Sequence, residues 1–203
     1  MSLRTPLPPP PPPAHIQAWP RPEAMLADRA RALDELSRRH LGPGRLALYW
    51  AQVAGAVLGW GFVGVALQSF EGLIDPLVAV FGAAAGAVGV AGVVTSWIFI
   101  GIGVGRDRTI RQLLGEWAEV GRSHGSAARR WRAPGLSLAW LLPSVVVCGL
   151  GLWSSIGFAL GARRGSETYL EAVFFIGLGV ILWVAGLIGV SKAVGHYRWA
   201  LRV

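Results

Sequence analysis

The sequence predicts an all-α integral membrane protein with four transmembrane helices, arranged as two tandem, duplicated hairpins with amphipathic helices on the cytoplasmic side. Composition is the first reason: 53% of the 203 residues are hydrophobic and 15% are charged, whereas roughly a quarter of a soluble domain is charged. The second reason is that the apolar residues come in runs of about 20, the length that crosses a bilayer. The third reason is an internal repeat.

The repeat begins where each of two basic segments turns into an apolar run. Residues 38–50 and 129–140 both contain Arg-Arg-x3-Pro-Gly followed by Leu-x-Leu-x-Trp. Two further matches follow in the same order, namely Trp60-x3-Gly64 with Trp153-x3-Gly157, and Trp97-x5-Gly103 with Trp183-x5-Gly189. Each match is short, but their shared order predicts a duplicated two-helix hairpin.

The chain starts with a proline-rich segment, residues 1–22, which holds an unbroken run of prolines at 8–13. Consecutive prolines lack backbone donors and favour the extended polyproline II conformation. Segments of this composition are typically disordered, so we expect a disordered tail. The alternative is a docking tail that enters a proline-recognising groove.

Residues 23–45 predict a cytoplasmic amphipathic helix. Its Asp34/Arg38 and Glu35/Arg39 pairs place an acid four residues before a base, the order that supports a helix. The apolar stripe along this helix is thin, and it fits either the membrane surface or a packing partner.

Residues 46–105 predict the first membrane hairpin, with spans at 47–67 and 77–104 joined by a short acidic loop. The second span is rich in small residues. Gly82 and Gly86 form a small-xxx-small pattern, continued by Gly89, that lets two helices approach closely in lipid. We assign these three glycines to helix packing.

Residues 106–135 predict a cytoplasmic amphipathic linker helix, because apolar residues recur at helical spacing between Ile110 and Val120. We expect this helix to lie at the lipid headgroups or to cover the base of the bundle. Residues 136–203 predict the second hairpin, with spans at 138–160 and 172–190 and a basic tail.

The distribution of arginine predicts the orientation. The segment before the first span and the 106–135 segment carry seven arginines each, whereas the loop between the first two spans carries none. The positive-inside rule then places both termini in the cytoplasm of a multi-pass protein of the bacterial plasma (inner) membrane. A basic face of this kind suits anionic lipid headgroups. The residues that we assign to the membrane interface and basic face are Trp50, Trp140, Arg38, Arg39, Arg106, Arg108, Arg129 and Arg130.

The spans offer no chemistry at bilayer depth, since they contain no Asp, Glu, Lys, Arg or His. A membrane enzyme or an ion-coupled carrier needs such groups there. The four histidines lie outside the spans without ligand spacing, so we expect solvated surface residues and no metal site. The single cysteine, Cys148, excludes an intrachain disulfide. We therefore expect no catalytic residues and no cofactor.

Two tryptophans, Trp97 and Trp183, lie deeper in their spans than an interfacial belt requires. An indole N–H at that depth needs an acceptor. We expect these residues to pack against neighbouring helices; the alternative is that they line a site for a flat hydrophobic ligand.

These features favour a non-enzymatic accessory or scaffold subunit of a membrane assembly. Its partners would be the lipid bilayer and other membrane protein subunits or further copies of itself, and we expect no nucleic acid. The alternative is an oligomeric pore or permease for an uncharged or lipophilic solute, because many transporters are built from repeats.

Overall fold

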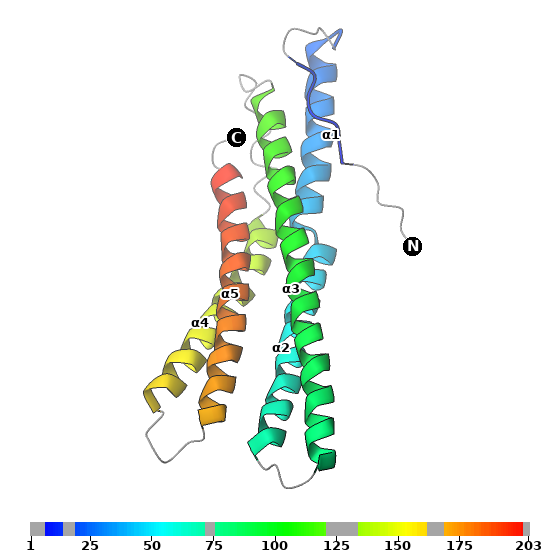
Figure 1. The fold of residues 1–203 in the computed structure, drawn as a ribbon. Helices are drawn as coiled ribbons and strands as arrows, with labels where there is room; N and C mark the ends of the chain where they lie inside the picture. The colour runs from blue at the N-terminus through cyan, green and yellow to red at the C-terminus, as the bar shows by residue number, and fades with distance from the viewer. Residues whose placement is uncertain (1–6, 14–18, 72–75, 121–133, 162–168, 201–203) are drawn as a thin grey trace.

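The computed structural model describes residues 7–13, 19–71, 76–120, 134–161 and 169–200. These residues form five helices and no strand (Figure 1): α1 (Pro22–Leu41), α2 (Pro43–Glu71), α3 (Pro76–Glu119), α4 (Pro134–Gly161) and α5 (Tyr169–Ala200). Four stretches of helix, in α2 to α5, are long and apolar enough to cross a membrane. The predicted all-α class with four spans is confirmed, and the chain is a multi-pass membrane protein.

The longest helix, α3, runs without interruption for 44 residues. It joins the predicted second span to the start of the predicted linker helix, so the boundary expected between residues 105 and 106 falls inside α3. The apolar stripe after that point packs against α1, so the helix has a reason to continue beyond the membrane span rather than to turn along the headgroups.

The first hairpin, α2 with α3, is held by close backbone contact at small residues. Gly59 and Gly89 face each other, and a Cβ added to Gly89 would lie 2.6 Å from the carbonyl oxygen of Gly59. Cβ atoms added to Gly82 and Gly86 would lie 2.7 and 3.1 Å from side chains of α2. The glycines predicted to mediate helix packing therefore pack inside this hairpin.

The second hairpin, α4 with α5, uses the same kind of contact. A Cβ added to Gly151 would lie 2.6 Å from the carbonyl oxygen of Gly179, and one added to Gly179 would lie 2.6 Å from that of Gly151. Further along the pair, Gly186 faces Cys148, and a Cβ added to Gly186 would lie 2.5 Å from the Cβ of Cys148. Glycine thus brings the two helices together over the length of α4.

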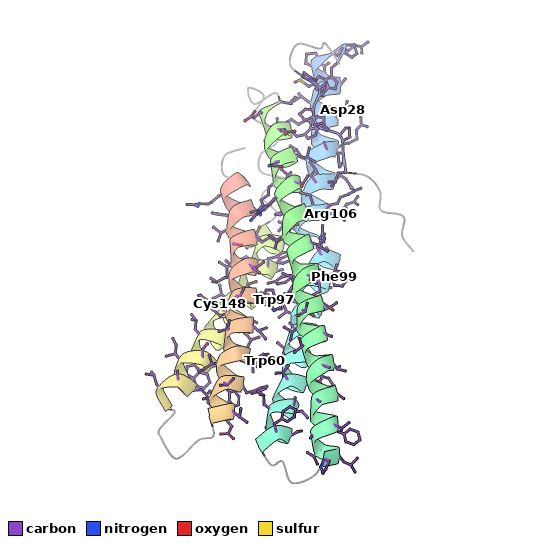
Figure 2. The ribbon with its side chains drawn as sticks, viewed as in Figure 1. Asp28, Trp60, Trp97, Phe99, Arg106 and Cys148 are labelled. Atoms are coloured by element: carbon purple, nitrogen blue, oxygen red, sulfur yellow. The ribbon has the colours of Figure 1, made fainter. Side chains whose placement is uncertain are left out.

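The two hairpins meet mainly through α2 and α5. Trp60 lies between them (Figure 2) and donates its indole N–H to the carbonyl oxygen of Phe174 at 2.9 Å. Its ring rests against Gly177, where a Cβ would lie 2.1 Å from the indole. Tyr49 of α2 donates its hydroxyl to the carbonyl oxygen of Ala185. Each contact satisfies a polar group that lipid could not satisfy.

Beyond the spans, α1 packs antiparallel to the C-terminal part of α3, and we call this helix pair the stalk (Figure 1). Its apolar core contains Ala32, Leu33, Leu36, Ile110, Leu114 and Trp117. The two apolar stripes that the sequence predicted in separate segments therefore bury each other. Arg29 ends the seam by donating from Nη2 to the carbonyl oxygen of Ala118 at 3.2 Å, a favourable place for a cation at a helix C-terminus.

Residues 7–13 lie along the stalk, as the dark-blue segment beside α1 in Figure 1 shows. Leu7 packs against the apolar core of the stalk, and the indole N–H of Trp117 donates to the carbonyl oxygen of Pro9 at 3.1 Å. Of the disordered tail predicted over residues 1–22, residues 1–6 and 14–18 lie outside the described residues, whereas residues 7–13 contact the stalk. The physical reason is that the stalk provides both an apolar surface and an indole donor.

Candidate functional site: a buried charged cluster

The seam of the stalk ends in four buried ionisable residues, which we call the charged cluster: His40, Asp107, Lys192 and His196. His40 closes α1 one turn after Leu36, and Asp107 lies one turn before Ile110 on α3. Lys192 and His196 lie one turn apart on α5. The cluster therefore joins the stalk to the second hairpin just beyond the membrane spans.

Asp107 lies at the centre of the cluster. Its Oδ2 is 2.7 Å from Nζ of Lys192, and its Oδ1 is 3.6 Å from Nδ1 of His40. The imidazole ring of His40 faces that of His196 with 6.0 Å between the ring centroids. One carboxylate thus faces a cation from α5 and an imidazole from α1.

Trp140 of α4 covers the ammonium group of Lys192, which lies 4.2 Å from the centre of the indole ring. A desolvated cation over an indole face is held by roughly 2 kcal/mol. The indole N–H of Trp140 donates to the carbonyl oxygen of Leu41 at 3.3 Å. At 1% exposure this side chain lies in the core, where it links α4 to the end of α1.

Burial and charge shift the pKa values within the cluster, whose members lie outside the predicted spans. Burial lowers the pKa of His40 below its ordinary value, although Asp107 opposes this shift. Burial alone would raise the pKa of Asp107, but His40 and Lys192 together hold that pKa below its ordinary value. Burial lowers the pKa of Lys192, an effect that Asp107 partly offsets. Asp107 is therefore a carboxylate at neutral pH and His40 is neutral.

A small cavity of about 50 Å³ opens beside the Asp107–Lys192 pair, with Arg45, Tyr49 and Gln52 also in its wall. A space of this size and polarity admits water, which needs only about 10–15 Å³. The arrangement suits an electrostatic link between α1, α3 and α5, with Asp107 and Lys192 open to water on one side. The cluster consists of two histidines, an aspartate and a lysine, and it contains no serine or cysteine that could act as a nucleophile.

The residues predicted for the basic face occupy different environments. Arg38 and Arg39 both pair with Glu35. Arg106 is half-buried and Arg108 is exposed at the same end of α3. Arg129 and Arg130 lie outside the described residues.

The other tryptophans that the sequence analysis singled out differ in how deeply they are buried. Trp50 packs beside Tyr49 with 5.4 Å between ring centroids. Trp97 packs against the core that surrounds Trp140 (Figure 2), whereas Trp183 is 37% exposed on α5. The two tryptophans that the repeat pairs with each other are therefore not equivalent.

Sequence reasoning missed the charged cluster. It assigned the histidines to the solvated surface, yet His40 is 0% and His196 is 2% exposed. Two signals were present: Lys192 is the single lysine of an arginine-rich chain, and Asp107 is an acid placed between Arg106 and Arg108. A side chain that breaks a local charge pattern at a span boundary is a candidate for burial.

A larger crevice opens between α2 and α5 at the opposite end of the hairpins. Its volume is about 440 Å³, and its wall includes Gly61, Gly64, Phe174 and Phe175, with Gln68 and Glu171 as polar members. It combines the two features typical of a small-molecule site, an apolar wall and a few polar groups.

Comparison of the chain with protein-family models, with curated proteins and with solved structures finds no match. The chain's own geometry therefore carries the functional argument.

Proposed function

We propose that the protein is a non-enzymatic accessory or scaffold subunit that holds the stalk at a fixed position on the cytoplasmic side of the plasma membrane. The observation that carries this proposal is the continuity of the stalk with the charged cluster. The seam runs from Arg29 through Leu36 to His40, and the Lys192–Asp107 pair then ties it to α5. A helix pair anchored in this way presents its outer surface in one orientation.

The cytoplasmic orientation is supported by the charges at the stalk end of the molecule. Arg31, Arg38, Arg108 and Arg111 are all exposed there, as the positive-inside rule requires of a cytoplasmic face. Within each hairpin the two helices are in close contact at glycines, and this similarity supports the proposed duplication.

The test is extraction from native membranes with a C-terminal tag in mild detergent, followed by native mass spectrometry. We expect a stoichiometric partner subunit with the unaltered chain. Arg31→Glu with Arg108→Glu changes exposed positions on both stalk helices and should release that partner. Val80→Ala, at a position 67% exposed on the membrane-spanning part of α3, is the control and should retain it. Recovery of homo-oligomers and lipid alone would contradict the proposal.

The second candidate function is a pore or permease for a lipophilic solute, which the crevice between α2 and α5 favours. Gly61 lines the crevice and has open space around its Cβ position, so Gly61→Leu fills the crevice without displacing the helices. Gly157 also has open space but does not line the crevice, and Gly157→Leu is the matched control. In reconstituted vesicles, transport blocked by the first change and kept by the second would establish this function.

A further inference from the structure

Residues 7–13 contact the stalk through an apolar side chain and a hydrogen bond. The chain enters along the apolar core at Leu7 and offers the carbonyl oxygen of Pro9 to the indole N–H of Trp117 at 3.1 Å. Outside this segment, Trp19 donates its indole N–H to Asp28 of α1 at 3.0 Å. Residues 7–13 are thus held by the apolar contact of Leu7 and the hydrogen bond at Pro9.

The exposure pattern along the segment matches an extended helix lying on one side. Pro8, Pro11 and Pro12 are partly buried, whereas Pro9, Pro10 and Pro13 are exposed. A polyproline II helix has about three residues per turn, so positions 8 and 11 share a face. The face that meets the stalk therefore carries prolines three residues apart.

Trp117 supplies the other half of a polyproline site. Its side chain is 6% exposed in the seam between the two stalk helices, and its N–H points out of that seam to a proline carbonyl. Polyproline II makes no internal hydrogen bonds, so its carbonyls are available to such a donor. Its low conformational entropy also favours docking on an apolar surface that offers an aromatic side chain and a hydrogen-bond donor.

We propose that the surface formed by α1 and α3 at Trp117 is a binding site for polyproline II segments, and that residues 7–13 are its tethered ligand. A proline-rich segment of another protein, with prolines three residues apart, binds this surface when it displaces the tethered one. This proposal is independent of the accessory-subunit function, because it concerns a peptide site and needs no membrane partner.

The first experiment asks whether the tethered segment is bound at Trp117 in the full chain. A nitroxide is attached at Pro13→Cys in a Cys148→Ala background, and its mobility is read by electron paramagnetic resonance. We expect a restricted spectrum. Trp117→Phe, which removes the N–H but keeps an aromatic ring, should raise the mobile fraction several-fold. Trp183→Phe is the control and should change nothing. A fully mobile label in the unaltered chain, or no response to Trp117→Phe, would overturn the proposal.

The second experiment tests recognition of a separate peptide by the full chain. The probe is a fluorescent peptide with the sequence of residues 5–14, and binding is followed by anisotropy. Weakening the tethered ligand by Leu7→Ser, Pro8→Ala and Pro11→Ala should tighten peptide binding at least tenfold over the unaltered chain, because a tethered ligand competes at an effective concentration in the millimolar range.

Two altered peptides identify the face that is read. Replacing the prolines at 8 and 11 by alanine should weaken binding, whereas replacing those at 10 and 13 should not. Adding Trp117→Phe to the weakened chain should cost roughly fivefold in affinity, the usual effect of one hydrogen bond. The absence of saturable binding to the weakened chain, or equal binding of both peptides, would overturn the proposal.

Discussion

The Lys192–Asp107 ion pair places two opposite charges where water has little access, so removal of either partner leaves the other charge buried. For Lys192→Met we expect a loss of about 3 kcal/mol in the free energy of unfolding, and hence a melting temperature in detergent lower by roughly 5–10 °C. The double variant Lys192→Met with Asp107→Asn removes both charges and should recover most of this loss. Equal melting of the single variant and the unaltered chain would show that the pair has no structural role.

His40 makes the stability of the protein depend on pH. Because burial lowers the pKa of His40 in the folded state, the unfolded chain takes up a proton first as the pH falls below about 6.5. The stability contributed by neutral His40 is therefore complete above that pH and is lost as the pH falls towards the folded-state pKa. Asp107 opposes the lowering of this pKa, whereas Lys192 and Arg111 add to it; the ring of His196 also faces His40.

The measurement is the melting temperature in detergent between pH 7.5 and pH 5. We expect it to fall over this range in the unaltered chain, and to fall less in His40→Gln, which keeps a polar side chain but does not titrate. An identical slope in both proteins would remove His40 as the cause.

The charged cluster shows which properties of single residues can be predicted from the sequence and which cannot. Lys192 and Asp107 were visible as exceptions in a basic context, but nothing local indicated that they pair. Their separation along the chain is long, and Asp107 lies between two arginines that suggest a solvated surface. The pairing depends on how the hairpins dock, and that docking is set by tertiary contacts such as Tyr49 with Ala185.

At the scale of the helix, glycine position rather than glycine content determines the packing. A methyl group on Gly89 would lie 2.6 Å from the carbonyl oxygen of Gly59, so Gly89→Ala should force α2 and α3 apart. Overpacking of this kind costs typically about 1–3 kcal/mol. Gly101→Ala, on the same helix with open space around the Cβ position, is the control and should leave the melting temperature unchanged or raise it.

Hydropathy predicted the membrane helices because bilayer thickness sets a length that a sequence must satisfy. It could not predict that α3 continues past Arg106 as one helix. Charged residues such as Asp107 and Arg108 end an apolar run without ending a helix, and helix termination needs a breaker or a capping residue. The amphipathic stripes of α1 and α3 were both visible, whereas their mutual burial followed only from the fold.

At the scale of the whole molecule, the two hairpins meet mainly through α2 and α5. Large apolar side chains such as Leu58, Phe81 and Leu160 remain exposed on α2, α3 and α4, as expected of helix surfaces that face lipid. The predicted duplication does not extend to these contacts. Trp60 fills the contact between hairpins, whereas Trp153, with which the predicted duplication pairs it, is 77% exposed.

The uneven distribution of charge along the whole molecule predicts its orientation in the membrane. The stalk and the C-terminal end of α5 should be cytoplasmic, because translocation of the arginines at that end of the molecule is unfavourable. Green fluorescent protein fused after residue 203 should fluoresce, and alkaline phosphatase at the same position should be inactive. Phosphatase inserted in the 72–75 connection should be active. Arg163→Ala with Arg164→Ala removes the two arginines between the last two predicted spans and should leave this pattern unchanged. Phosphatase activity at residue 203 would place the stalk on the opposite side of the membrane and would exclude a cytoplasmic partner for it.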